Sequence, residues 1–253
     1  RSSIILIHRQ EDRHVVKKVV LVGAGPGDPE LITVKGLKYV RSADVVVYDR
    51  LVSEELLREC KPTCEKIYVG KSYGDAELQS FINEILVKKA NEGKLVVRLK
   101  GGDPYVFGRG EEECQYVLSH GIDCEVVPGV SSVTAGPLLA GIPIAGRTTE
   151  PAFTAVTATR EGGGVIEEAY IPRRGTLIFV MGASKLAELR NVLLTARKPE
   201  EPVALIRNAS LPDMEVRVTT VDGLSSLAGV MKPPLLVVVG KAVNMRERLW
   251  KQA

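Results

Sequence analysis

The chain has 253 residues, with 34 Lys and Arg against 31 Asp and Glu, three His and four Cys. Its 45% apolar and 26% charged residues are ordinary for a globular protein and exclude a disordered chain. A net charge of +3 excludes a heavily basic nucleic-acid-binding surface, and no apolar run approaches the ~18 residues of a membrane helix. We therefore expect a cytoplasmic protein that binds neither nucleic acid nor membrane.

Metal and triad chemistry are not expected. The cysteines show no C-x-x-C spacing, and the histidines are too few and too scattered for a zinc site or a Ser-His-Asp triad. We expect the four thiols to be reduced and to bind no metal. They are Cys60, Cys64, Cys114 and Cys124.

The first part of the chain alternates between predicted strands and helices. Residues 1–16 lack the pattern of a signal peptide and are expected to form an N-terminal extension. The apolar run 19–22 predicts a buried strand that leads into glycine-rich residues 23–27. Asp28 suits an N-cap and Pro29 a first helical position, so a helix is expected over about 29–41. Further strands are expected at 44–48, 95–99 and 124–127, and further helices over about 78–93 and 109–120.

The second part has a different pattern. A cluster of Gly and Pro at 141–151 marks a break, after which residues 214–220 alternate like a half-exposed antiparallel strand. We predict an α/β fold of two domains. Residues 17–146 form an N-terminal domain with a parallel-rich sheet and helices, and residues 147–253 form a C-terminal α/β domain with a mixed sheet. Strands of the second domain are expected at 153–159, 176–180, 203–207, 215–219 and 235–239, and a helix near 186–193.

Two glycine-rich loops follow predicted strands. Gly23-x-Gly25-x-Gly27 permits either a tight turn or a dinucleotide-binding fingerprint with Asp49 as the ribose acid. The spacing departs from G-x-G-x-x-G, and Asp28 would repel a pyrophosphate, so the dinucleotide interpretation is the weaker one.

In the second loop, Gly101 and Gly102 suit the wall of a pocket for a flat, nearly neutral group such as adenine. Asp103 is either an acceptor for a ribose or an amino group, or a cap for the next element. Farther on, Gly162–Gly164 fits a mobile lid and a plain surface loop equally well.

Several stretches of the chain carry distinctive motifs: residues 20–33, 47–52, 98–110 with 112–113, 127–132, 141–143 and 180–182. Together, these stretches resemble the tetrapyrrole (precorrin) methyltransferases over about residues 19–243. The resemblance implies a two-domain fold, a homodimer, S-adenosylmethionine in the cleft between the domains and S-adenosylhomocysteine as a product. It implies methylation of uroporphyrinogen III at C2 and C7, through precorrin-1 to precorrin-2, for sirohaem or cobalamin biosynthesis. A methyltransferase for a later precorrin and a non-catalytic module that binds a nucleotide or tetrapyrrole are the alternatives.

The resemblance also implies roles for individual residues. Asp49 and Lys71 take the catalytic positions, and Arg50 and Arg147 pair with substrate carboxylates. From the sequence alone, Asp49 also fits a turn cap with Arg50 as its surface partner, and Met181 fits a buried core position. The implied methyl-donor contacts are Pro26, Gly101, Gly102, Asp103, Val106, Ser131, Ser132, Met181 and Ala209.

A basic cluster near these loops suits a substrate with eight carboxylates. The cluster is expected to comprise Arg50, Lys71, Arg98, Lys100, Arg109 and Arg147.

The chain departs from the family pattern at three places. Residues Ile144–Arg147 stand where relatives usually have Leu-Thr-His-Arg, and Thr157–Thr159 stand where they have Thr-Gly-His. Ala209 replaces a usual Gly.

Overall fold

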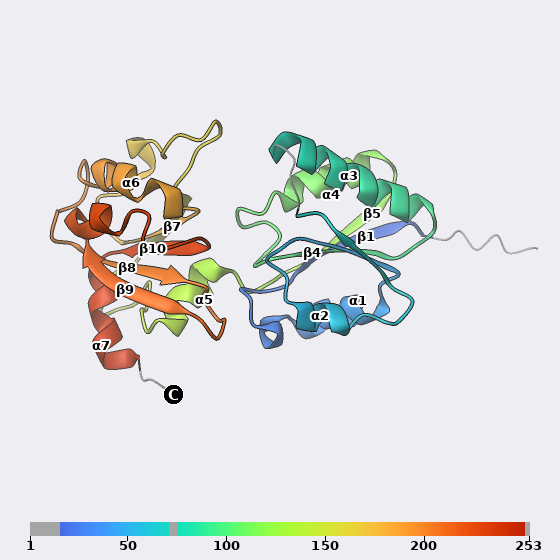
Figure 1. Cartoon of the computed structure of the whole chain (residues 1–253), viewed down its shortest axis with the longest axis horizontal. Coiled ribbons are helices and arrows are strands. Elements are labelled where there is room, and N and C mark those ends of the chain that lie inside the picture. Colours follow the sequence, from blue (N-terminus) through green and yellow to red (C-terminus); the bar gives the residue numbers. More distant parts are fainter. Residues whose placement is uncertain (1–15, 71–74, 251–253) are drawn as a thin grey trace, which may run out of the picture.

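The computed structural model describes residues 16–70 and 75–250. They form two five-stranded sheets, one in each half of the chain, and helices cover both (Figure 1). The two-domain α/β architecture expected from the sequence is thus confirmed.

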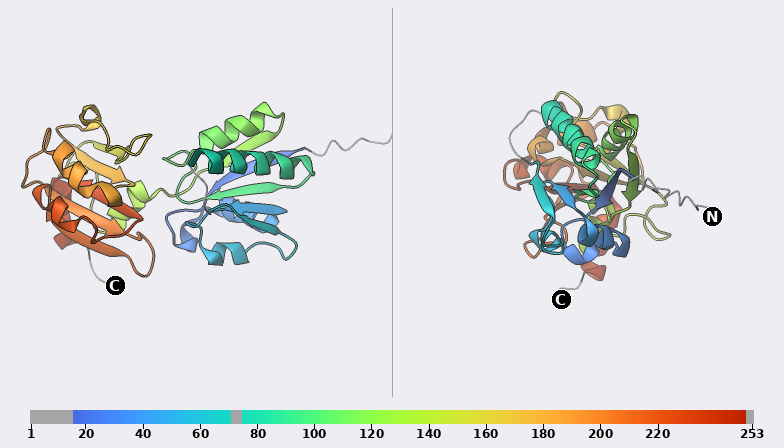
Figure 2. Two further views of the ribbon diagram at one scale, coloured as in Figure 1. Left: turned by 45° about the horizontal axis from the view of Figure 1, so that its top comes forward. Right: turned by 90° about the vertical axis from the view of Figure 1, so that its right-hand side faces the viewer.

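The first sheet has the order β3-β2-β4-β1-β5, and all of its strand pairs are parallel. Helices α1 and α2 cover one face, and α3 and α4 cover the other (Figures 1 and 2). The elements are β1 (Lys18–Gly23), α1 (Val34–Ser42), β2 (Val45–Tyr48), α2 (Glu54–Arg58), β3 (Glu65–Tyr68), α3 (Asp75–Asn91), β4 (Val96–Lys100), α4 (Gly110–Ser119) and β5 (Asp123–Val127).

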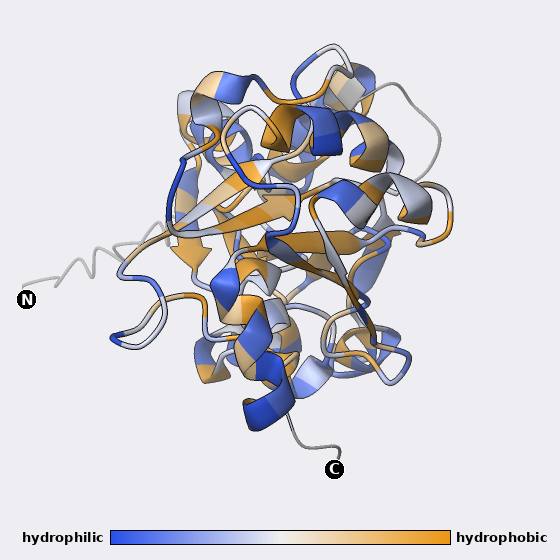
Figure 3. Ribbon diagram, turned by 90° about the vertical axis from the view of Figure 1, so that its left-hand side faces the viewer, coloured by the Kyte–Doolittle hydropathy of each residue, from blue (hydrophilic) through white to orange (hydrophobic). Residues whose placement is uncertain are grey.

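The apolar run in β1 explains why helices lie on both faces. Val19 and Leu21 point into the core beneath α3 and α4, whereas Val20 and Val22 point into the core above α1 and α2. Successive side chains of a strand face opposite sides, so an uninterrupted apolar run requires cover on each. Figure 3, which faces the second domain, shows largely apolar strands at the centre of the molecule with more polar segments around them.

The second sheet has the order β6-β7-β10-β8-β9 and is mixed, as expected: only β6 and β7 pair in parallel. The strand predicted at 214–220 is antiparallel to β8 and partly exposed, which confirms the interpretation of its alternating pattern. The elements are α5 (Ser132–Leu139), β6 (Phe153–Thr157), β7 (Thr176–Val180), α6 (Leu186–Leu193), β8 (Pro202–Arg207), β9 (Glu215–Thr220), β10 (Leu235–Val239) and α7 (Arg246–Leu249).

Helix α5 packs with the second sheet although it precedes residue 146. Its Val133, together with Ala140 and Ile142, lies in the same core cluster as Ile178 and Leu236 of that sheet. On this packing we propose that the second domain begins before α5 and not at residue 147.

The helix expected over 29–41 is wrong in its first turn. Asp28 does cap a helix, but this is a 3-10 turn over Pro29–Leu31, and Ile32 and Thr33 are extended. Thr33 then accepts a hydrogen bond from the N–H of Gly36 at 3.0 Å and begins α1 at Val34. Because the α-helix starts well after the glycine turn, its N-terminus is not placed to bind a phosphate there, which weighs further against a dinucleotide fingerprint.

Within residues 16–70 and 75–250, no helix is both long enough and apolar enough to cross a membrane.

Candidate active site

The carboxyl ends of β1 and β4 form a topological switch point in the first sheet. The two strands are neighbours, with Gly23 beside Lys100, but the chain leaves them in opposite directions. The loop after β1 leads to α1 on one face, and the loop after β4 leads to α4 on the other. Divergent connections of this kind open a crevice at the strand ends, which is where open α/β sheets bind ligands.

The loops after β1, β4 and β5 are in direct backbone contact. Gly25 and Gly102 exchange hydrogen bonds of 3.2 and 2.7 Å. A Cβ on Gly129, after β5, would lie 2.1 Å from the carbonyl oxygen of Gly102, and one on Gly23 would lie 2.5 Å from the Cα of Gly129. Glycine at 23 and 129 therefore permits an approach that any side chain would prevent, so the tight-turn interpretation accounts for part of the glycine pattern.

Asp103 connects the loop after β4 to the loop after β5 by hydrogen bonds. Its Oδ1 accepts a hydrogen bond from the N–H of Tyr105 at 2.9 Å, and its Oδ2 accepts one from the N–H of Gly129 at 3.1 Å. Asp103 therefore does not cap helix α4, as the alternative interpretation expected; its carboxylate instead caps the turn that begins the β4–α4 loop and ties that loop to Gly129. Each oxygen keeps a further lone pair for a ligand.

The loop of Pro26 meets the second domain. The N–H of Asp28 donates to Ser210 Oγ at 2.9 Å, and a Cβ on Gly27 would lie 2.9 Å from a methyl carbon of Leu211. Both partners follow Ala209, which is 8% exposed. The structure therefore brings the Pro26 loop beside the segment that follows Ala209, as a site built from both domains requires.

Ser131 and Ser132 lie at the start of α5, close to the same loops. Ser131 is the N-cap and accepts a hydrogen bond from the N–H of Val133 at 3.2 Å. Among the described residues, a Cβ on Gly102 would meet only the Cα of Ser131, at 3.9 Å, so space remains between the two segments.

Two of the proposed donor contacts are exposed apolar side chains. Val106 lies at the tip of the β4–α4 loop and is 40% exposed, and Met181 follows β7 and is 53% exposed. The alternative that Met181 fills the core is therefore wrong.

The non-glycine residues with left-handed backbone in the described chain lie in the β4–α4 loop, directly after β7 and on either side of Ala209. Met181 has φ +57°, and Asn208 and Ser210 have φ +50° and +71° on either side of Ala209. Phe107 and Arg109, in the β4–α4 loop, have φ +53° and +57°. Non-glycine residues in this conformation are strained, and such strain collects at ligand sites.

Asp49 immediately follows β2, at the same sheet edge. Its Oδ1 accepts a hydrogen bond from the N–H of Leu51 at 3.0 Å, so it does cap the turn. Its charged partner is Arg98 and not the expected Arg50, with Arg98 Nη2 3.7 Å from Asp49 Oδ2. Leu51 contacts the loop after β4, because a Cβ on Gly101 would lie 3.0 Å from its Cβ. The second catalytic candidate, Lys71, lies outside the described residues.

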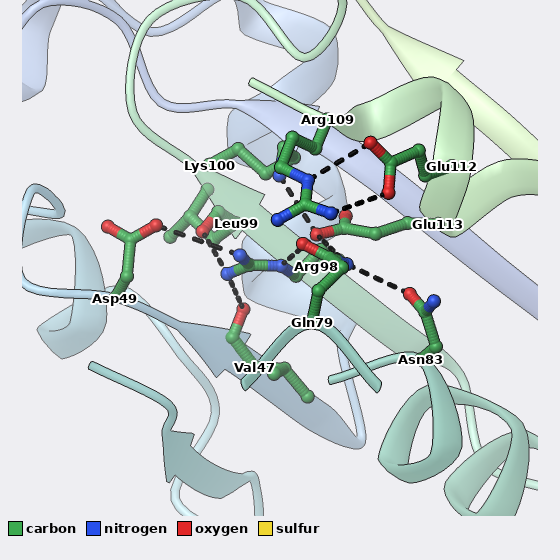
Figure 4. A network of polar contacts seen from close by, with 10 residues as sticks. All are labelled: Val47, Asp49, Gln79, Asn83, Arg98, Leu99, Lys100, Arg109, Glu112 and Glu113. Atoms are coloured by element: carbon green, nitrogen blue, oxygen red, sulfur yellow. Dashed lines mark hydrogen bonds and ion pairs between the residues drawn. The ribbon is translucent and has the colours of Figure 1, made fainter. Parts of the chain in front are cut away.

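The expected basic cluster is wrong in two of its members. Arg98 and Lys100 are only 3% and 5% exposed, and both hold the carboxylate of Glu113, which is fully buried (Figure 4). Burial, followed by the neighbouring charge of Arg98, lowers the pKa of Lys100. Neither cation is thus presented to a substrate.

The other described cations of that cluster, Arg50, Arg109 and Arg147, lie at the surface. Arg109 forms a two-pronged ion pair with Glu112, at 3.0 and 2.9 Å, and this contact lowers the pKa of the Glu112 carboxyl (Figure 4). Arg50 and Arg147 are exposed, as side chains that meet substrate carboxylates must be.

A cavity of about 350 Å³ lies between the β4–α4 loop and the edge of the second sheet. Phe107 comes from the first domain, and Arg160 and Tyr170 from the connection after β6. That connection contains Gly162–Gly164, which turn a short hairpin closed by a 2.8 Å hydrogen bond from the N–H of Arg160 to the carbonyl of Gly164. The remaining lining residues are Ala155, Val156, Thr157, Thr159, Ile166 and Glu167.

In the part of the chain that the structure describes, no group of three or more His, Cys, Asp or Glu is arranged to hold a metal ion, and the four cysteines are free thiols.

Comparison with known proteins decides the family. A family described as Tetrapyrrole (Corrin/Porphyrin) Methylases matches residues 18–225. The chain belongs to the tetrapyrrole methylases. Within this family it is 46% identical to a uroporphyrinogen-III C-methyltransferase of Methanocaldococcus jannaschii, over 90% of this chain and 97% of the relative.

Solved structures of tetrapyrrole methylases share the fold. Uroporphyrin-III C-methyltransferase from Thermus thermophilus, complexed with S-adenyl homocysteine, matches with a TM-score of 0.77 and 39% identity over 89% of this chain and 93% of that one. A cobalt precorrin-4 methyltransferase matches with a TM-score of 0.80 and 28% identity, over 90% and 96% of the two chains.

Proposed function

We propose that this tetrapyrrole methylase transfers methyl groups from S-adenosylmethionine to C2 and C7 of uroporphyrinogen III. The product is precorrin-2, formed through precorrin-1, and it serves sirohaem or cobalamin synthesis. The observation that carries the proposal is the assembly of glycine loops at the switch point, which meets the second domain beside Ser210 and lies next to the turn of Asp49. The 46% identity to a uroporphyrinogen-III C-methyltransferase supports this substrate over a later precorrin.

The described residues fit the methyl donor. Gly102 has φ +66° and leaves open space toward Ser131, so backbone groups of residues 101–103 can line a wall for a flat adenine. The family resemblance assigns further donor contacts to Ala209 and Met181 of the second domain, and the exposed Met181 and Val106 offer apolar surface. When bound, the donor supplies an activated methyl group. The residues of this chain hold it in line with the accepting carbon.

Asp49 has the position and chemistry for work on the substrate. When a pyrrole carbon takes the methyl group, positive charge develops on the ring nitrogens and a proton must then leave. The Asp49 carboxylate is 28% exposed and is oriented by the N–H of Leu51, so it can face a ring, stabilise that charge and accept the proton.

The exposed Arg50 and Arg147 pair with carboxylates of the substrate, to which the guanidinium geometry is suited. Phe107 and Tyr170 offer aromatic surface to the macrocycle from the cavity between the domains. Lys71 remains a second catalytic candidate on its sequence motif alone.

The family resemblance also leads us to propose a homodimer that acts in the cytoplasm. Sedimentation of the purified chain tests the first point, and fractionation of cells tests the second.

A competition assay tests the function. The purified chain is incubated with labelled S-adenosylmethionine and equal amounts of uroporphyrinogen III and a precorrin that already carries the C2 and C7 methyl groups. Label is expected on uroporphyrinogen III. Label on the methylated precorrin alone would identify the enzyme of a later step, and donor binding without transfer would identify a binding module.

A further inference from the structure

A buried charge cluster lies directly behind Asp49. Glu113 of α4 is 0% exposed, and its Oε1 accepts hydrogen bonds from Arg98 Nε at 3.3 Å and Lys100 Nζ at 3.0 Å (Figure 4). Gln79 of α3 adds a third donor at 3.4 Å. The cluster joins two helices to the central strand β4.

Stability alone is a poor reason for such a cluster. Removing charges from water costs about as much as their mutual attraction returns, and a buried ion pair can often be replaced by apolar side chains without loss. In this cluster the buried charges and hydrogen-bonding groups are also incompletely paired. Glu113 Oε2 is buried without a hydrogen-bond partner among the residues that the structure describes, and two cations share one carboxylate.

Arg98 connects this cluster to the proposed catalytic group. Its Nε faces Glu113, whereas its Nη2 lies 3.7 Å from Oδ2 of Asp49. Its Nη1 donates to the backbone carbonyls of Val47, at 3.5 Å, and Leu99, at 3.3 Å. The guanidinium is thus fixed between β2 and β4, with one edge on a fully buried acid and one on a partly exposed acid.

We propose that Glu113 and Arg98 are positioning residues for Asp49. Glu113, held by α4, fixes the Arg98 guanidinium. Arg98 and the Leu51 N–H then hold the two oxygens of Asp49 from different sides, which sets the direction of the carboxylate before the substrate arrives. This inference rests on the function proposed above, because positioning Asp49 matters only if Asp49 acts on the substrate.

Arg98→Lys is the most informative variant. An ammonium keeps the buried charge and can pair with Glu113, but it lacks the fork that also reaches Asp49. We expect a folded protein with kcat for methyl transfer about tenfold lower and the KM for the donor within about twofold. Glu113→Gln keeps the shape of the side chain but removes the charge that holds Arg98, and it is also expected to lower kcat. Arg41→Gln, which breaks only the exposed pair with Glu59 in the same domain, serves as the control and should leave both constants unchanged.

A double-mutant cycle separates positioning from general support of the fold. If Arg98 acts through Asp49, then Arg98→Lys has almost no further effect on kcat in an Asp49→Asn background. Equal losses in both backgrounds would overturn the inference while leaving the proposed function intact. If Asp49→Asn retains full activity, the catalytic role of Asp49 is refuted together with the positioning that depends on it.

A crystal structure of Arg98→Lys supplies a readout that does not depend on turnover, and it applies even if the wild type leaves uroporphyrinogen III unmethylated. We expect the Asp49 carboxylate to turn away from β4 or to lose one defined orientation. An unmoved carboxylate would contradict the inference. If Arg98→Lys does not fold, the same measurements on Glu113→Gln decide, with the same expected and contrary results.

Discussion

Replacing Gly129 by alanine is expected to separate the loops that form the proposed donor site. The new Cβ would lie 2.1 Å from the carbonyl oxygen of Gly102 and 2.7 Å from the Cα of Gly23. Ordinary contacts begin near 3.4 Å, so the Gly102 loop must retreat by roughly 1.3 Å, the difference between 3.4 and 2.1. Both colliding atoms belong to the backbone, and therefore no rotamer change can relieve the overlap.

The cost follows from the size of this displacement. Overfilling a packed site costs about 1–3 kcal/mol, and about 1.4 kcal/mol corresponds to a tenfold change in affinity. We expect Gly129→Ala to lower the free energy of unfolding by about 2 kcal/mol in a urea titration and to weaken donor binding about tenfold in calorimetry.

Gly121→Ala provides the control. Gly121 has φ +70°, and no described residue comes within 4 Å of a Cβ there, so alanine introduces backbone strain without a collision. It should lose about 1 kcal/mol of stability and leave donor affinity unchanged. If Gly129→Ala behaves like Gly121→Ala, or like the wild type, the three loops are not in the contact described and the reasoning fails.

Three further predictions concern single side chains. Asp49→Asn should lower methyl transfer about 100-fold or more with donor binding retained, and a loss of donor binding in calorimetry would instead place Asp49 in the donor site. Arg147→Ala should raise the KM for uroporphyrinogen III about three- to tenfold without changing that for the donor, and an unchanged KM would remove it from the substrate site. Lys18, then Lys35 and Tyr39, hold Glu125 by hydrogen bonds and lower its pKa from 4.5 to about 2. Its stabilising effect is therefore fully present above pH 4.5 and is lost as the pH falls through about 2. Glu125→Gln should cost about 1 kcal/mol in urea unfolding at pH 7 and almost nothing once the pH is below about 2, and a difference that persists there would contradict this origin.

The sequence predicted nine of the ten strands, because their signals are local; the short and largely polar β3 (Glu65–Tyr68) was not expected. Continuous apolar runs identified strands buried on both faces, and the alternating residues 214–220 identified the half-exposed β9. The start of α1 was predicted too early. Asp28 and Pro29 are residues that typically begin a helix, but here they begin only one 3-10 turn. Thr33 competes as a second N-cap, and nothing in the spacing says which one begins the long helix.

Sequence motifs predicted the glycine loops and Asp49 as parts of the site. They did not predict the contacts that depend on how distant segments pack together. Spacing could not show that Arg98 and Lys100 are buried, since charge alone suggests a surface. Their alternation with apolar residues in the strand Val96–Lys100 would by itself suggest a half-exposed strand, so the local pattern gave no sign that both faces are covered. Glu113 becomes that partner only when α4 packs on the sheet.

The cavity between the domains has a similar explanation. Phe107 stands far from Arg160 and Tyr170 in the sequence, and no local pattern joins them. The glycine run Gly162–Gly164 predicted a loop in the connection after β6, but it did not indicate that this connection lines a cavity.

The regiochemistry of the products tests the central claim most directly. The purified chain is supplied with uroporphyrinogen III and S-adenosylmethionine labelled in its methyl carbon, and the products are separated over time and examined by NMR. We predict a product with one new methyl group, followed by one with two, on C2 and C7. Label at any other ring position, or uroporphyrinogen III recovered unmethylated under conditions in which the donor binds, would contradict the account.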